Sequence, residues 1–182
     1  VYDCVKQYKY CFVIASSSNI DRVQSISEAV PRGKYFLMDE FQKKLLDMAV
    51  DYEGYVFEKP LVYGKNLEKK METCGFVMLI RESNSNIYEE YVRKYPDDTC
   101  LIYSMWSGYL EYPRMKKLFG IAEKNKRIIH SSGHVVLDDL NEFINIIGPK
   151  KIVVIHTDTD DVDGLEQKKN IMSIKDGERF YL

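Results

Sequence analysis

The sequence predicts an α/β fold with three α/β/α layers around a mainly parallel sheet. Short apolar runs alternate along the chain with longer amphipathic stretches, a pattern typical of strands connected by helices. The apolar runs are uninterrupted, as expected for strands that helices cover on both faces. The chain has 182 residues, of which 45% are hydrophobic and 30% are charged, and this composition excludes a disordered chain.

The expected elements follow one another in a regular order. Strands are expected at the apolar runs 10–15, 34–38, 75–80, 99–104, 127–130 and 151–156. Amphipathic helices are expected at 20–30, 40–50, 84–95, 113–125 and 137–147, with shorter ones near 66–72 and 163–170. Capping residues support these boundaries, because Ser18 or Asn19 precedes the first helix, Asp39 precedes the second and Gly148-Pro149 follows the fifth.

The end of the chain and the position of the histidines suggest a second part. Residues 171–174 and 179–182 are expected to form a β-hairpin, since the Asp176-Gly177 pair between them favours a type I′ turn. All three histidines lie beyond residue 126. The sequence therefore predicts an α/β domain at 1–125 and a second segment at 126–182.

Charge, hydropathy and cysteine spacing exclude several classes of protein. Lys and Arg number 26 and Asp and Glu 28, for a net charge of −2, which argues against a general polyanion binder. No window approaches the roughly 18 apolar residues of a membrane helix, so no membrane association is expected. The four cysteines form no C-x-x-C pair. This spacing favours free thiols in a reducing, cytoplasmic setting.

The histidines mark the first candidate site. His130, His134 and His156 each stand at or just past the end of an apolar run, where open α/β sheets present ligands and catalytic groups. Ser131-Ser132-Gly133 precedes a helix whose N-terminus could hold a phosphate. From the clustering alone, a capped surface loop with solvated histidines is an equally good interpretation.

Three other features of the sequence could carry a function. The acidic run 158–164 fails as a calcium loop, because Thr159 and Asn170 stand where an EF-hand needs Asp and Glu. Arg22 suits a phosphate, although an ordinary helix N-terminus also explains it. The segment 103–112 holds the only tryptophan, Trp106. Its aromatic residues fit stacking on a base or packing in an inter-domain surface.

These motifs resemble a known family. Ser131-Ser132-Gly133-His134, a helix, Gly148-Pro149-Lys150 and a strand that ends in His156 are similar to the closing motifs of the β-CASP nucleases of the metallo-β-lactamase fold, such as bacterial ribonuclease J. The run Ser18-Asn19-Ile20-Asp21-Arg22 resembles a Ser-Asn-x-x-Arg stretch early in their β-CASP domain. The order and spacing agree across nearly the whole chain.

The resemblance implies a zinc-dependent hydrolase that cleaves RNA. It implies that His134 is the catalytic proton donor at the scissile phosphate and that His156 ligates one of two zinc ions. It places Ser132 and Gly133, next to Ser131, near the phosphate. Position 157–158 departs from the family, because Thr157-Asp158 replaces its Gly-Glu.

The resemblance also implies that the chain is a fragment, in which 1–125 is a β-CASP domain and 126–182 is a returning segment of the metallo-β-lactamase core. The H-x-H-x-D-H signature of the family's N-terminal lactamase half does not occur in these residues. We therefore expect the isolated chain neither to bind two zinc ions nor to cleave RNA. We also expect apolar surface on 126–182, and hence self-association into a homo-oligomer. Two alternatives stay open: a nucleotide- or phosphate-binding module without hydrolysis, and an interaction domain in which 103–112 docks a protein.

Overall fold

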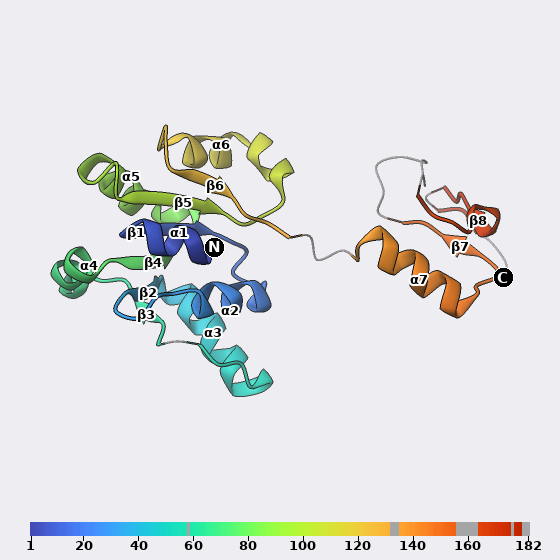
Figure 1. The fold of residues 1–182 in the computed structure, drawn as a ribbon, viewed down its shortest axis with the longest axis horizontal. Coiled ribbons are helices and arrows are strands. Elements are labelled where there is room, and N and C mark those ends of the chain that lie inside the picture. The colour runs from blue at the N-terminus through green and yellow to red at the C-terminus, as the bar shows by residue number, and fades with distance from the viewer. Residues whose placement is uncertain (58, 132–134, 156–163, 176, 180–182) are drawn as a thin grey trace. The chain divides into compact units, whose positions relative to one another are not determined.

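A computed structural model describes residues 1–182 except 58, 132–134, 156–163, 176 and 180–182 (Figure 1). The described chain forms two compact units, Val1–Ser131 and Ser132–Leu182. No helix among the described residues is long and apolar enough to cross a membrane.

The first unit contains a six-stranded sheet in which every pairing is parallel. The strands lie side by side in the order β3-β2-β4-β1-β5-β6. Their bounds are β1 Tyr10–Ile14, β2 Tyr35–Met38, β3 Leu61–Val62, β4 Phe76–Leu79, β5 Thr99–Tyr103 and β6 Lys126–Ile128. The predicted parallel sheet is confirmed, and β3 is an additional strand that the sequence did not predict.

Helices connect these strands. The α-helices are α1 Tyr2–Gln7, α2 Ile20–Glu28, α3 Glu40–Glu53, α4 Glu68–Cys74, α5 Ser85–Lys94 and α6 Pro113–Gly120. Short 3-10 turns are η1 Lys65–Leu67, η2 Glu82–Asn84 and η3 Ser107–Glu111. The helix α1 was not predicted, and α6 ends before the predicted limit at residue 125.

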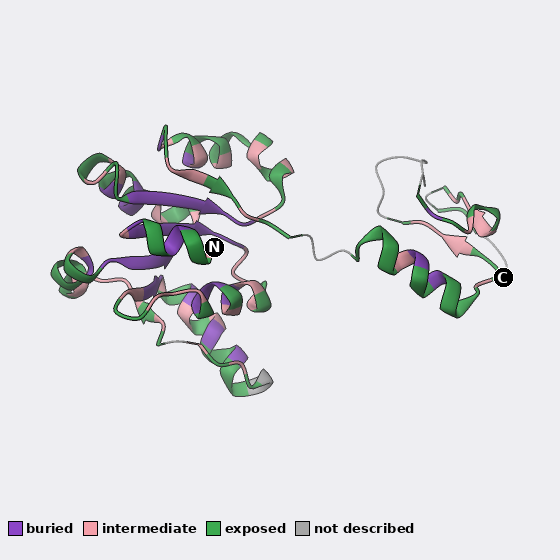
Figure 2. Ribbon diagram, viewed as in Figure 1, coloured by how far each residue is buried: buried purple, intermediate pink, exposed green. Residues whose placement is uncertain are grey.

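Alternate residues of each strand face opposite sides of the sheet, and each side has its own apolar core. One core packs the strands against α1, α2 and α3 through Val5, Val23, Ile26 and Leu46. The other packs them against α4, α5 and α6 through Met71, Tyr88, Tyr91 and Leu118. Figure 2 shows the central strands in purple, between helices whose outer faces are green. The three-layer α/β/α architecture is thereby confirmed.

Capping side chains fix the start of the two helices that follow β1 and β2. The Asn19 side chain accepts a hydrogen bond from the backbone N–H of Arg22 at 3.0 Å. Asp39 and Gln42 form a capping box, in which each side chain accepts from the other's backbone N–H. Because these bonds satisfy N–H groups that a helix leaves unpaired, they set where each helix begins.

The second unit is smaller. It contains α7 Leu137–Ile147, a parallel pair of strands, β7 Ile152–Val153 and β8 Ile171–Met172, and the 3-10 turn η4 Lys168–Asn170. The Asn141 side chain joins the helix to a distant loop, donating to the Gly164 carbonyl at 2.9 Å and accepting from the Glu166 N–H at 3.1 Å.

Several expectations for this part differ from the structure. Within the described residues, the predicted helix at 163–170 is reduced to η4. The first half of the predicted hairpin, at 171–174, contributes β8, which pairs with β7 in parallel. A turn is present where Glu178 donates to the Lys175 carbonyl at 3.0 Å, but most of the partner strand lies outside the described residues. The first unit includes β6 and extends to Ser131, and the division into 1–125 and 126–182 stays a prediction.

Candidate functional site

The carboxyl ends of the six strands meet at one edge of the first unit, because all the strands are parallel. The chain leaves β1 toward α2 on one face, whereas it leaves the neighbouring β4 and β5 toward α5 and α6 on the other. Where connections from adjacent strands diverge in this way, the edge of an open α/β sheet binds ligands. The ends of β1, β4 and β5 are therefore the expected place for a site.

Arg22 ties together three segments at this edge. Its guanidinium donates to the Ser104 hydroxyl at 3.1 Å, and it donates to both the carbonyl and the hydroxyl of Ser131 at 2.7 Å. Arg22 lies on α2, Ser104 directly follows β5, and Ser131 lies beyond the end of β6. One side chain thus fixes the positions of two segments that are 82 and 109 residues away in the sequence.

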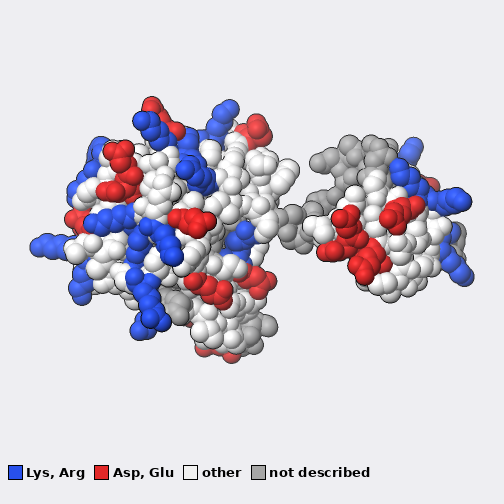
Figure 3. Space-filling model, in the orientation of Figure 1, with Lys and Arg blue, Asp and Glu red and all other residues white. Residues whose placement is uncertain are grey.

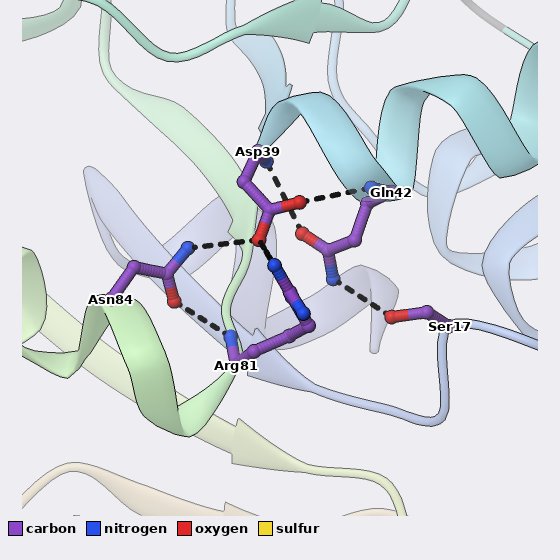
Figure 4. Close-up of polar contacts among 5 residues, drawn as sticks. All are labelled: Ser17, Asp39, Gln42, Arg81 and Asn84. Atoms are coloured by element: carbon purple, nitrogen blue, oxygen red, sulfur yellow. Dashed lines mark hydrogen bonds and ion pairs between the residues drawn. The ribbon is translucent and has the colours of Figure 1, made fainter.

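A second polar cluster lies at the ends of β1, β2 and β4 (Figure 4). Arg81 pairs with Asp39 at 2.6 Å, and Asn84 donates to the same carboxylate oxygen at 3.5 Å. The Gln42 amide donates to the Ser17 hydroxyl at 3.2 Å. These side chains satisfy one another, and they join the loop after β1 to the starts of α3 and η2.

The two clusters differ in charge. The Arg81 charge is balanced by the Asp39 carboxylate, whereas Arg22 bonds to neutral oxygens of Ser104 and Ser131. No carboxylate among the described residues forms an ion pair with Arg22. A guanidinium has five N–H groups and suits the oxygens of a phosphate. Of the two clusters, the Arg22 cluster is therefore the one that can attract an anion.

The comparison with protein families bears on this edge. Residues 121–172 match the model of the Zn-dependent metallo-hydrolase RNA specificity domain. The match indicates a segment of a zinc-dependent metallo-hydrolase within residues 121–172, and it is consistent with the resemblance to the β-CASP nucleases. A search among curated proteins found no match.

The RNA specificity domain match includes Ser131, the residue that Arg22 holds. It begins at residue 121, just after α6, and continues through β6, α7 and β7 to the last residue of β8. The matched segment therefore contributes one strand and the Ser131 contact to the candidate edge, and it also makes up most of the second unit.

Of the predicted site residues, the structure describes Ser131. Ser131 is exposed, next to the exposed His130, at the Arg22 cluster. Ser132, Gly133, His134 and His156 lie outside the described residues. Among the side chains that are described, no three or more His, Cys, Asp and Glu groups gather in a way that could hold a metal ion.

Sequence reasoning missed Ser104 and Arg81 as parts of this edge. Ser104 directly follows β5, and Arg81 is separated from the end of β4 by one residue. The histidines were noted as candidates because of the same kind of position. Asp39 was recognised only as a helix cap, although it also pairs with Arg81. A search for polar residues at the ends of all the apolar runs would therefore have identified Ser104 and Arg81.

Proposed function

We propose that this chain forms part of a zinc-dependent hydrolase that cleaves RNA phosphodiester bonds, and that Arg22 and the Ser131–Gly133 segment receive a backbone phosphate. The observation that supports the proposal best is the Arg22 cluster. Arg22 holds the first residue of the predicted phosphate segment with two hydrogen bonds of 2.7 Å. That segment lies inside the match to the RNA specificity domain.

The proposed roles follow the sequence predictions. Arg22 binds and orients the phosphate, Ser132 and Gly133 contact it, and His134 donates a proton to the leaving oxygen. His156 is a zinc ligand, together with residues of an H-x-H-x-D-H signature outside this sequence. Bound zinc supplies a water activated for attack on phosphorus. On this proposal the 182-residue chain binds RNA and does not hydrolyse it unaided.

Arg22→Ala tests the proposal. We expect this variant to bind a single-stranded RNA at least about ten-fold more weakly, because a hydrogen bond to a charged group contributes about 1.5–3 kcal/mol. We also expect the salt dependence of binding to decrease by about 0.7 in logarithmic slope, the value for one lost phosphate contact on a single strand. Fluorescence anisotropy of a labelled RNA at several salt concentrations measures both quantities.

Arg93→Ala is the matched control, because Arg93 is an exposed arginine at the end of α5. Its affinity and salt slope should equal those of the unchanged protein. Arg22→Lys keeps the charge but loses the planar fork, so its affinity should lie between those of the unchanged chain and the alanine variant. Equal weakening by Arg22→Ala and Arg93→Ala would contradict a specific role for Arg22.

A further inference from the structure

A group of exposed aromatic side chains follows β5, close to the Arg22 cluster. Trp106 is 58% exposed, Tyr109 40% and Tyr112 62%. The rings contact one another in series, since Trp106 and Tyr109 meet edge to face at 5.4 Å and Tyr109 and Tyr112 stack at 6.1 Å. We call these three residues the aromatic platform.

Neighbouring residues fix the position of the platform by packing into the core and by a hydrogen bond. The neighbouring Met105, Leu110 and Met115 pack against the core between the sheet and α5 and α6. The Tyr103 hydroxyl donates to the Trp106 carbonyl at 3.0 Å. In this segment the aliphatic side chains are therefore buried, whereas the larger aromatic side chains are exposed to solvent. If only the burial of apolar area decided the packing, the aromatic side chains would be the ones buried.

Gly108 gives the indole its position. A Cβ at residue 108 would lie 2.3 Å from the Trp106 ring, so any larger residue would displace that ring. The ring therefore lies against the backbone of Gly108 and against the Tyr109 ring, and the residue stays 58% exposed. A fixed aromatic face of this kind loses little side-chain freedom when a flat ligand stacks on it.

The surroundings favour a nucleic acid as the occupant. A hollow of about 530 Å³ beside the platform is lined by Met105, Tyr109, Tyr112 and Met115, with Glu82 and Arg114 at its rim. The helix α6 carries Arg114, Lys116 and Lys117, all exposed, and no acidic residue. Arg114 pairs with Glu82 at 3.5 Å, so the positive charge beside the platform comes from Lys116 and Lys117. In the region where Figure 1 places α6, Figure 3 shows blue side chains with a few red ones beside a mostly white surface. Flat apolar rings beside positive charge are what a base and its phosphate require.

The platform also adjoins the proposed phosphate site. Ser104, which accepts from Arg22, precedes Trp106 by two residues, a chain length of at most about 7 Å. We propose that the aromatic platform stacks an unpaired nucleobase of a single-stranded RNA whose backbone contacts Arg22. This inference rests on the proposed function, and it adds a base-binding subsite to it.

Trp106 reports on the proposal directly, because it is the only tryptophan of the chain. The probes are a short oligoadenylate and an abasic oligomer with the same number of phosphates. We expect oligoadenylate to quench the Trp106 fluorescence and to bind at least about five-fold more tightly than the abasic oligomer, since stacking on an aromatic ring favours each base measurably. Tyr112→Ala should remove most of that difference, whereas Tyr112→Phe should keep it.

Tyr2→Ala is the matched control, because Tyr2 is an exposed tyrosine on α1, 52% accessible, and this variant should bind both oligomers as the unchanged chain does. Circular dichroism of each variant confirms that the fold is retained.

Equal binding of the two oligomers would overturn the base-binding platform and leave the phosphate contact standing. Failure of both oligomers to bind would overturn the proposed function as well. If Tyr112→Ala changed self-association in sedimentation and left oligoadenylate binding unchanged, the platform would be a protein interface and the inference would be wrong.

Discussion

At the scale of single residues, the environment decides what a side chain of a given type does. Arg22 and Arg81 both lie at the carboxyl edge of the sheet, yet Asp39 neutralises Arg81 and only serine oxygens bond to Arg22. The sequence alone could not separate these two arginines, because the partner of each comes from a segment more than 40 residues away. The same applies to the cysteines, whose reactivity depends on burial.

The buried thiols predict how stability depends on alkaline pH. Burial raises the pKa of Cys11 and of Cys100 to about 12, from an ordinary value of 9.0. The folded state thus retains protons that the unfolded chain releases above pH 9. The stabilisation is complete below that pH and is lost as the pH rises from about 9 toward 12, by about 1.4 kcal/mol per thiol and pH unit.

Urea unfolding at about pH 8 and about pH 9.5 measures this loss while most tyrosines, whose ordinary pKa is about 10, stay protonated. Cys100→Ala should reduce the difference in unfolding free energy between the two pH values, although it lowers stability at both because it leaves a cavity. Cys74 is exposed, so Cys74→Ala should leave the difference unchanged. The same pH dependence in all three proteins would show that Cys100 does not contribute to it.

At the scale of elements, local signals in the sequence were sufficient for most of the first unit. Asn19 and Asp39 cap α2 and α3 as predicted, and the apolar runs became strands. The sequence did not give the order of strands, because pairing depends on contacts between distant segments. It also missed α1, a helix of 6 residues with no side-chain cap, for which the local signal is weak.

The Asp39 cap provides a prediction for one element. Asp39→Ala removes the bond to the Gln42 N–H and the ion pair with Arg81. We expect a loss of about 2 kcal/mol in unfolding free energy, of which about 1 comes from the helix cap and up to about 1 from the ion pair. Asp39→Asn keeps a capping oxygen and loses the charge, so it should cost about 1 kcal/mol or less.

Chemical denaturation of both variants measures these losses. The matched control is Asp47→Ala, which removes the exposed i,i+4 pair with Lys43 on the same helix and should change stability by no more than about 0.5 kcal/mol. Equal destabilisation by Asp39→Ala and Asp39→Asn would mean that the ion pair, and not the cap, stabilises the start of α3.

At the scale of the whole molecule, the two units differ in how well they cover their apolar side chains. The first unit buries its central strands β1, β4 and β5 completely, although its helices and loops also expose large apolar side chains such as Phe41, Val56 and Trp106. In the second unit, α7 and its neighbouring segments expose large apolar side chains, namely Val135, Val136, Leu137, Phe143, Ile146, Ile147 and Ile155. The sequence predicted apolar surface in 126–182 from the family resemblance. It could not predict which side chains form that surface, because an amphipathic pattern does not show whether the apolar face is covered.

This surface predicts that the chain self-associates, because clustered exposed apolar side chains favour contact between molecules. We expect the weight-average mass in sedimentation equilibrium to rise with protein concentration. Ile146→Lys should suppress the rise, since it places a charge on the exposed face of α7. Val56→Lys is a close control, because Val56 in the first unit and Ile146 in the second are each 76% exposed, and it should leave association unchanged. A monomer mass at all concentrations, or equal suppression by both variants, would contradict association through the second unit.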